Sequence, residues 1–347
     1  MTQYLLSLPP RYEVYRAQYP TLTPCRVTLQ EKGRYQILSA AGAQPAQVSG
    51  RFQFEAKTAS DYPAVGDYVM ADLNGGGTAV IHAVLPRSGA FLRKAAGTSK
   101  SEQVVAANVD IAFLCMALNR DFNLRRLERY LAVAWDSGAT PVLLLTKTDL
   151  CDDVAAKIAQ AGSVAMGVDI VAVCALEADG WRAVEPYLKD GVTLAFIGSS
   201  GVGKSTLINR LLGEERLETN GLRDDDRGRH TTTRRELIVL PCGATVIDTP
   251  GMRELGMWDV GEGFSSAFAD IEALAGGCRF KDCTHRQEPG CAVRAALERG
   301  ELSAERLLSY QKLQSENAYS EDAKAYLAAK REKFKMISRF SKANRGK

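Results

Sequence analysis

Eight consecutive residues, 198–205, have the types and the spacing of a loop that binds phosphate. They read G-S-S-G-V-G-K-S and fit the pattern G-x-x-x-x-G-K-[ST] at every position. An apolar segment, 193–197, precedes them and a helical pattern, 204–212, follows, as such a loop requires and a chance Gly/Ser-rich turn would not provide. Glycines let successive backbone N–H groups surround phosphate oxygens at a helix N-terminus. We therefore expect these residues to bind nucleotide phosphates: Gly198, Ser199, Ser200, Gly201, Val202, Gly203, Lys204, Ser205 and Thr206.

A magnesium site is expected beside this loop. Lys204 should reach the β- and γ-phosphates, and the Ser205 hydroxyl should bind Mg²⁺. Asp248 follows the apolar segment 244–247 and begins D-T-P-G, which suits an acid that holds Mg²⁺ at the end of a buried strand. The Gly251 N–H, at the end of that motif, would bond the γ-phosphate.

A polar segment, 220–235, lies between these motifs and is rich in Gly, Asp and Arg. A loop that senses the γ-phosphate needs a threonine, and this one contains G-R-H-T-T-T. The hydroxyl of Thr232 or Thr233 would complete the magnesium shell. The alternative is a disordered polar loop with no such role.

The residue after D-T-P-G bears on the rate of catalysis. Ras-like GTPases often place a glutamine there to orient the attacking water, whereas this sequence has Met252. We therefore expect slow intrinsic hydrolysis that a partner accelerates, with His230 positioning the water. The alternatives are that His230 contacts only RNA or solvent, or that Arg229 or Arg234 supplies the missing charge.

Four residues that follow the apolar segment 141–145 would select the base: Thr146, Lys147, Thr148 and Asp149. The Asp149 carboxylate can accept hydrogen bonds from N1–H and the amino group of guanine. Adenine lacks both donors and would leave a buried carboxylate unpaired, which argues against an ATPase or a small-molecule kinase. The Lys147 stem can cover the base. Thr146 stands where the usual motif has Asn, and its hydroxyl can still tie this segment to the phosphate loop.

A second base-binding loop is expected at Cys174, Ala175 and Leu176, after the apolar segment 169–173. The Ala175 N–H would meet guanine O6. Both base segments precede the phosphate loop, whereas ordinary GTPases begin with that loop. A parallel sheet can be cut at one loop and rejoined at another without a change in packing, so the order indicates a circularly permuted GTPase domain.

Three of the eight cysteines fall within 14 residues, in the pattern C-x4-C-x-H-x5-C. Without a secretory signal, reduced thiols are expected, so the cluster indicates a metal site in place of disulfides. Three thiols and an imidazole form a closed tetrahedral Zn²⁺ shell, which is typical of a structural site. The expected zinc ligands are Cys278, Cys283, His285 and Cys291, and the alternative is a chance grouping of thiols.

The segments around these motifs predict an α/β domain flanked by two other parts. Residues 26–30, 34–39, 47–54, 67–72 and 78–84 read as short strands and predict a barrel of the oligonucleotide-binding (OB) type, although an SH3-like barrel would look much the same. From residue 110 onward, apolar strands alternate with helices, which predicts a mostly parallel sheet. After residue 262 we expect only helices, at 292–298 and from 304 onward. The expected strands of the α/β domain are 110–118, 141–145, 169–173, 193–197, 236–240 and 244–247, and its expected helices are 124–135, 154–161, one from Trp181, and 204–212.

Composition and charge are those of a globular chain with a basic end. Hydrophobic residues make up 46% of the 347 residues and charged residues 24%, with a net charge of +3. Residues 323–347 contain nine Lys or Arg and one acid, which suggests phosphate-rich partners; the alternative is a solvated helix. No apolar run approaches the roughly 18 residues that span a membrane, and the first residues do not resemble a secretory signal.

Taken together, the motifs resemble those of the small-ribosomal-subunit-dependent GTPases, the RsgA (YjeQ, YloQ) family. The resemblance rests on T-K-x-D, G-S-S-G-V-G-K-S, G-R-H-T-T-T, D-T-P-G and the cysteine pattern, and it covers nearly the whole chain. It implies a cytoplasmic factor that hydrolyses GTP late in small-subunit maturation, is stimulated by that subunit, and contacts rRNA through its barrel and zinc modules.

The expected organisation is therefore an OB-type barrel at 1–100, a permuted GTPase domain at 101–262 and a zinc-binding helical domain with a basic tail at 263–347. The expected partners are GTP or GDP and the small ribosomal subunit with its rRNA, with no membrane, and a monomer is expected. The alternative function is a GTP-gated rRNA-binding switch with negligible turnover.

Overall fold

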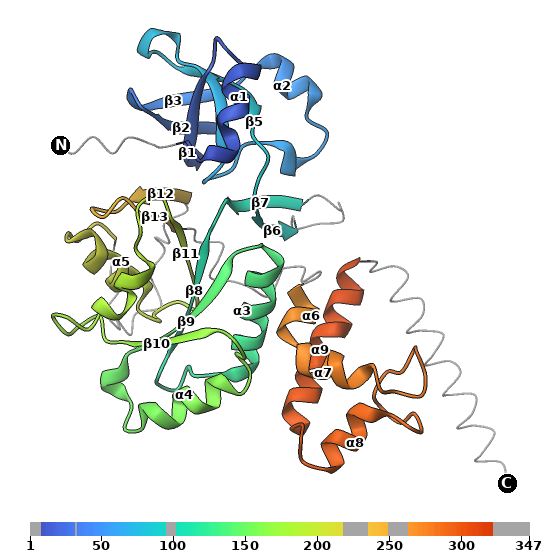
Figure 1. Cartoon of the computed structure of the whole chain (residues 1–347). Coiled ribbons are helices and arrows are strands. Elements are labelled where there is room, and N and C mark those ends of the chain that lie inside the picture. The colour runs from blue at the N-terminus through green and yellow to red at the C-terminus, as the bar shows by residue number, and fades with distance from the viewer. Residues whose placement is uncertain (1–7, 32, 95–101, 218–234, 249–262, 322–347) are drawn as a thin grey trace, which may run out of the picture. The chain divides into compact units, whose positions relative to one another are not determined.

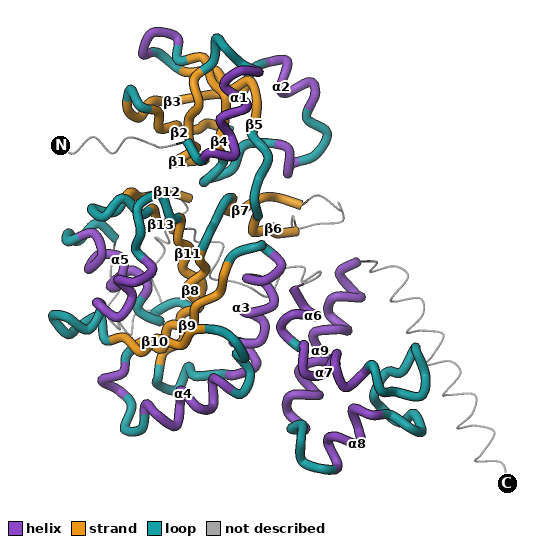
Figure 2. Tube along the Cα trace, viewed as in Figure 1, coloured by secondary structure: helices purple, strands orange, loops and turns teal. Residues whose placement is uncertain are grey.

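The computed structural model describes residues 8–31, 33–94, 102–217, 235–248 and 263–321, and the side chains of 317–321 lie outside this description. The chain forms two compact units, Met1–Trp258 and Asp259–Lys347. The described part of the first unit combines a barrel with an α/β sheet, and that of the second is helical (Figures 1 and 2). The division into three domains at residues 100 and 262 remains a prediction.

The N-terminal part of the first unit is a closed barrel of five strands. These strands are β1 (Thr23–Glu31), β2 (Arg34–Ser39), β3 (Gly42–Val48), β4 (Tyr68–Asp72) and β5 (Ala79–Val84). They pair in the order β1-β2-β3-β5-β4, and β4 closes onto β1. All pairs are antiparallel except β3 with β5. This arrangement is that of the OB-type barrel, as predicted.

The predicted strand at 47–54 is wrong beyond Val48. There β3 ends and a short helix, α2 (Gly50–Glu55), begins. The Ser49 hydroxyl accepts the backbone N–H of Phe52 at 3.1 Å, which caps this helix and turns the chain out of the sheet. Residues 51–54, Arg-Phe-Gln-Phe, alternate between polar and apolar side chains as a strand does. The serine cap before them instead starts a helix. A second helix that the sequence analysis missed, α1 (Glu13–Gln18), precedes the barrel.

The α/β part contains a six-stranded sheet that confirms the predicted alternation. Its spatial order is β10-β9-β8-β11-β13-β12, and only β12 runs antiparallel to its neighbour β13. The predicted helix from Trp181 is instead a 3-10 helix, Arg182–Tyr187, with a proline inside it. A hairpin of β6 (Ala90–Lys94) and β7 (Glu102–Ala107), which the sequence analysis missed, precedes this part. The α/β elements are β8 (Ile111–Ala117), α3 (Leu124–Asp136), β9 (Thr140–Thr146), α4 (Val154–Gly162), β10 (Asp169–Val173), β11 (Thr193–Ile197), α5 (Lys204–Leu212), β12 (Arg235–Val239) and β13 (Thr245–Asp248).

The strand that leads into the phosphate loop, β11, lies near the centre of this sheet, between β8 and β13. On one face, the rings of Phe113 and Phe196 pack with centroids 5.1 Å apart, and Leu207 and Ile208 of α5 belong to the same buried cluster. Helix α3 packs against β8 and β9 with a buried Leu127. Since β8, β9, β10 and β11 are parallel, their carboxyl ends meet at one edge, where α/β sheets bind ligands.

The barrel and the α/β sheet are joined through β12. Leu29 and Gln30 of β1 pair with Glu236 and Arg235 of β12, so the strands of both parts form one continuous sheet. Beside this join, the buried guanidinium of Arg26 donates to the Thr193 hydroxyl at 2.6 Å. The strand β12 therefore has a barrel strand on one side and β13 on the other.

The second unit has four helices and no strand among its described residues, 263–321. The last two helices were predicted and the first two were not. The four helices are α6 (Gly263–Ala267), α7 (Ala269–Ala275), α8 (Ala292–Glu298) and α9 (Ala304–Glu321). Its core contains the rings of Phe264, Phe268 and Tyr310, with centroids 5.0 to 5.5 Å apart. Among the described helices of either unit, none is long and apolar enough to cross a membrane.

Candidate functional site

The phosphate loop follows β11 directly, at the carboxyl edge of the sheet. Gly198 has to be glycine because a Cβ there would lie 2.7 Å from the Cys115 carbonyl oxygen of β8. Gly201 and Gly203 adopt positive φ angles of 74° and 102°, which glycine tolerates best. Helix α5 then begins at Lys204 with Gly203 as its N-cap. The loop thus has the strand, the turn and the helix N-terminus that the sequence predicts.

Lys204 is buried, and two backbone carbonyls fix its ammonium group. Its Nζ donates to the Gly198 and Ser199 carbonyl oxygens, each at 2.6 Å. A lysine ammonium has three N–H donors and no acceptor, so these two bonds largely set where the charge lies. The positive charge is therefore held at the mouth of the loop by the loop's own backbone.

The base motif and the phosphate loop contact each other at Thr146. This residue ends β9, and its hydroxyl donates to the Val202 carbonyl oxygen at 2.6 Å. A link of this kind between the two segments was expected from a Thr in place of Asn, and the structure contains it as this hydrogen bond. Lys147 follows in the left-handed region, with φ of 58°, and a 3-10 turn, Thr148–Leu150, presents Asp149.

The second base loop reaches the same place from the end of β10. The Cys174 thiol donates to Oδ1 of Asp149 at 3.2 Å, and the guanidinium of Arg210 on α5 donates to the Ala175 carbonyl at 3.0 Å. Gly180 closes this loop, because a Cβ there would lie 2.2 Å from the Cys174 carbonyl oxygen. Leu176 is exposed. The two base segments and the phosphate loop, which lie apart in sequence, therefore form one site.

The predicted site residues that follow the phosphate loop in sequence are described only in part. Asp248 is half-buried at the end of β13, and β13 pairs in parallel with β11. His230, Thr232, Thr233 and Gly251 lie outside the described residues, as does the basic tail.

One acid that was not predicted contacts the phosphate loop. Asp121, in the connection from β8 to α3, accepts the Ser199 hydroxyl at 2.5 Å and the Arg126 guanidinium at 2.7 Å. Burial raises the pKa of Asp121, but the bonds from Ser199 and Arg126 and the charge of Lys147 bring it below its usual value overall. The signal in the sequence was its position: Asn-x-Asp after a buried strand, at the ligand-binding edge.

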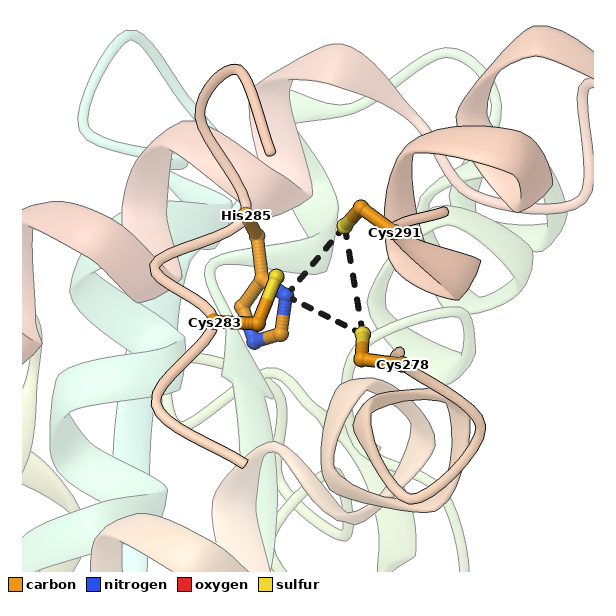
Figure 3. Close-up of side chains that lie close together, drawn as sticks. All are labelled: Cys278, Cys283, His285 and Cys291. Carbon is orange, nitrogen blue, oxygen red and sulfur yellow. Dashed lines mark hydrogen bonds between the residues drawn. The ribbon is translucent and has the colours of Figure 1, made fainter. Parts of the chain in front are cut away.

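The four predicted metal ligands converge on one point in the second unit (Figure 3). Their ligand atoms all lie within 4.8 Å of one another. The His285 Nδ1 atom is 3.6 Å from the Cys278 sulfur and 3.4 Å from the Cys291 sulfur, and these two sulfurs are 3.9 Å apart. The four side chains can hold a metal ion.

Local structure prepares this cluster for a cation. The Cys291 sulfur accepts the Arg294 N–H at the start of α8, and the backbone N–H groups of Val293 and Ala292 face the Cys278 sulfur. Burial raises the pKa of the Cys278 thiol, but those N–H groups and the neighbouring thiols lower it below its ordinary value overall. At Cys278 the lowered pKa favours the thiolate, which is the form that binds metal, whereas burial and the two neighbouring thiols raise the pKa of Cys283 to about 11.

Comparisons with known proteins identify the family of this chain. The model of the RsgA GTPase family matches residues 84–258. A protein of Lactiplantibacillus plantarum named small ribosomal subunit biogenesis GTPase RsgA 2 is 51% identical over 295 residues, which cover 85% of this chain and 83% of that protein. A protein of Opitutus terrae named small ribosomal subunit biogenesis GTPase RsgA is 50% identical over 86% of this chain and 84% of its own length.

Solved structures show the same fold. The crystal structure of YjeQ from Thermotoga maritima aligns with a TM-score of 0.63 at 24% identity, over 86% of this chain and 99% of that one. The crystal structure of YloQ, described as a circularly permuted GTPase, aligns with a TM-score of 0.60 at 24% identity, over 86% of this chain and 95% of that one. The fold is thus that of a circularly permuted GTPase, and on the extent of the sequence matches the chain belongs to the RsgA GTPase family.

Proposed function

We propose that this protein hydrolyses GTP in the cytoplasm as a late maturation factor of the small ribosomal subunit. Binding to that subunit accelerates the hydrolysis of GTP by the protein. Relatives that are about half identical to this chain are named small ribosomal subunit biogenesis GTPases, which supports a role in maturation of that subunit. The single observation that carries the proposal is the assembly of a base site and a phosphate loop into one site. Thr146 bonds Val202, and Cys174 bonds Asp149.

The base in this proposal is guanine. The Asp149 carboxylate accepts N1–H and the amino group, the Lys147 stem covers the ring, and the Ala175 N–H meets O6. Thr148 and Leu176 border the base. Adenine would leave the carboxylate without donors, at a cost of about 1 to 3 kcal/mol or more for a charged group. Asp149→Asn should shift binding from GTP to xanthosine triphosphate, because an amide can donate to the xanthine 2-oxygen.

The phosphates in this proposal lie on the loop from Gly198 to Thr206. Ser205, Asp248 and one of Thr232 and Thr233 would hold Mg²⁺, which supplies charge neutralisation between the β- and γ-phosphates. Lys204 has one N–H beyond the two that the loop carbonyls accept, and this N–H is shared between the β- and γ-oxygens. The Gly251 N–H donates to the γ-phosphate.

We assign the positioning of water to His230, since Met252 has no group to orient it. A His230→Ala protein should bind GTP normally but lose stimulated turnover. Full stimulated turnover in that protein would exclude the role.

The metal in this proposal is a structural zinc ion. A tetrahedral site with Zn–S bonds of about 2.3 Å places two sulfurs about 3.8 Å apart, close to the observed separation of Cys278 and Cys291. With Cys283 and His285 the shell has four protein ligands and no open position for water. Metal analysis of the purified protein should give one zinc per chain. The barrel and this zinc module would contact rRNA.

The decisive experiment measures GTP hydrolysis with small subunits, large subunits or neither. We expect about a hundredfold stimulation or more by small subunits alone, the order that one positioned catalytic group contributes. Nucleotide-dependent binding to small subunits without stimulated hydrolysis would replace this function with that of a GTP-gated RNA-binding switch. Light scattering of the same protein should give the mass of a monomer.

A further inference from the structure

The acid that contacts the phosphate loop, Asp121, uses each carboxylate oxygen for a different partner. Its Oδ2 accepts the Ser199 hydroxyl at 2.5 Å, and its Oδ1 accepts Nη1 of Arg126 at 2.7 Å. Ser199 is the second residue of the phosphate loop and lies 78 positions away in sequence. A charge-assisted hydrogen bond of this length is among the stronger interactions a hydroxyl can make.

The connection that presents Asp121 is itself fixed at both ends. The Asn119 side chain accepts the Asp121 N–H at 2.9 Å, and the Asn119 carbonyl accepts the Phe122 N–H. Asn123 caps α3 by accepting the Arg126 N–H at 3.0 Å. These bonds fix the segment that carries both the Asp121 carboxylate, which contacts the phosphate loop, and the Arg126 guanidinium, which contacts Asp121.

Two contacts then lead from this acid to Lys204. Asp121 holds the Ser199 side chain, and the Ser199 carbonyl accepts Nζ of Lys204 at 2.6 Å. Residue 199 is therefore held from both sides, by a carboxylate on its side chain and by an ammonium on its backbone. A shift of Ser199 would move a carbonyl that orients the lysine.

We propose that Asp121 is a positioning residue for the nucleotide: by holding Ser199 it keeps Lys204 aimed at the β- and γ-phosphates. The proposal rests on the proposed binding of GTP phosphates at this loop and adds a residue from outside the sequence motifs. Asp121 acts through Ser199 and does not itself touch the nucleotide.

Arg126 has a separate part in this arrangement. A carboxylate beside a phosphate loop would repel the triphosphate, and the guanidinium balances that charge at close range. The charge of Lys147 also acts on Asp121. Without Arg126, the repulsion would act more strongly on GTP than on GDP, because GTP carries the additional phosphate.

The test is a double-mutant cycle between Asp121→Ala and Ser199→Ala, read as the dissociation constants of fluorescent GDP and GTP. Each single variant should weaken binding about tenfold, the order of one charge-assisted hydrogen bond. The double variant should be no weaker than either single one, because both remove the same contact. Asp121→Asn keeps an acceptor for Ser199 and should recover most of the affinity. A general loss of packing would not be rescued in this way.

Matched controls separate the possible failures. Asp152→Ala removes an exposed carboxylate from the same part of the chain, and Arg125→Ala removes an exposed guanidinium beside Arg126. Both should bind like the wild type, whereas Arg126→Ala should weaken GTP more than GDP, with a difference that shrinks at high salt. Additive losses in the cycle, or wild-type affinity in Asp121→Ala, would overturn the proposal.

Nucleotide binding by a Lys204→Ala variant tests the nucleotide site itself. If that variant loses GDP binding while Asp121→Ala does not, the nucleotide site stands and only the role of Asp121 fails. If Lys204→Ala binds normally, the placement of the phosphates fails, and the role of Asp121 with it.

Discussion

The nucleotide site and the metal cluster are assembled by different means. The nucleotide site joins loops that follow separate strands of one sheet, and short hydrogen bonds such as Thr146 to Val202 connect them. The metal cluster takes all four ligands from one short connection between α7 and α8. The first site is thus placed by the strands of a sheet. The second has only the local turns of its own loop.

This difference predicts different responses to damage. Where the fold places the loops, one lost contact should lower affinity and leave the sheet intact. Where a metal ion would hold the loop together, loss of one ligand should unfold the whole segment. In such a site the free energy of metal binding also stabilises the folded loop.

The largest effect is expected from Cys283→Ser, which removes one ligand of the metal cluster. Zinc content should fall well below one per chain, and amide hydrogen exchange over residues 276–291 should accelerate by about a hundredfold or more. GDP affinity should not change. Cys242→Ser, an exposed thiol outside both sites, is the control. Unchanged exchange in Cys283→Ser would mean that the loop holds its structure without metal.

The next effect is expected from Gly198→Ala. Its Cβ would lie 2.7 Å from the Cys115 carbonyl oxygen, so the phosphate loop would have to move away from β8. We expect GDP affinity to fall by tens of fold, about 2 kcal/mol, with full metal content. Gly50→Ala has free space around the new methyl group and serves as the control. Equal affinity in both variants would contradict this account.

A smaller effect is expected from Thr146→Val, which keeps the shape of the side chain and removes the hydroxyl. The Val202 carbonyl would lose its 2.6 Å donor, at a cost of about 1 kcal/mol. GDP should bind about fivefold more weakly by titration calorimetry, and Thr146→Ser should restore the affinity. Failure of serine to restore it would show that the methyl group, and not the hydroxyl, matters.

The smallest effect is expected from Cys174→Val. A thiol is a weak donor, so loss of its bond to Asp149 should weaken GDP binding only about two- to threefold. Cys174→Ser keeps a donor and should bind at least as well as the wild type. A tenfold loss in the serine variant would indicate that the loop depends on the size of sulfur.

The sequence predicted the elements that its periodicity encodes. The segments 169–173, 193–197, 204–212 and 292–298 match β10, β11, α5 and α8 to the residue. The failures have local causes. The strand at 47–54 was wrong because a serine cap outweighs an alternating pattern, and the 3-10 helix at Arg182–Tyr187 contains a proline that prevents an α-helix.

The contact of Asp121 with Ser199 could not have been predicted from local patterns. It depends on β8 lying beside β11, and these two strands are separated in the chain by α3, β9, α4 and β10. By contrast, every ligand of the metal cluster could be named from spacing, because the chain returns to one point within 14 residues.

The pairing of β1 with β12 has a consequence for truncated fragments of this protein. A fragment that begins at residue 101 would retain β12 but lose the strand that pairs with Arg235 and Glu236. Its outer N–H and C=O groups would then form an open sheet edge, which is a template for pairing with other chains. We expect such a fragment to self-associate more than one that ends near residue 258, in which β1 still pairs with the first two residues of β12. The barrel thus also shortens the open edge of the GTPase sheet.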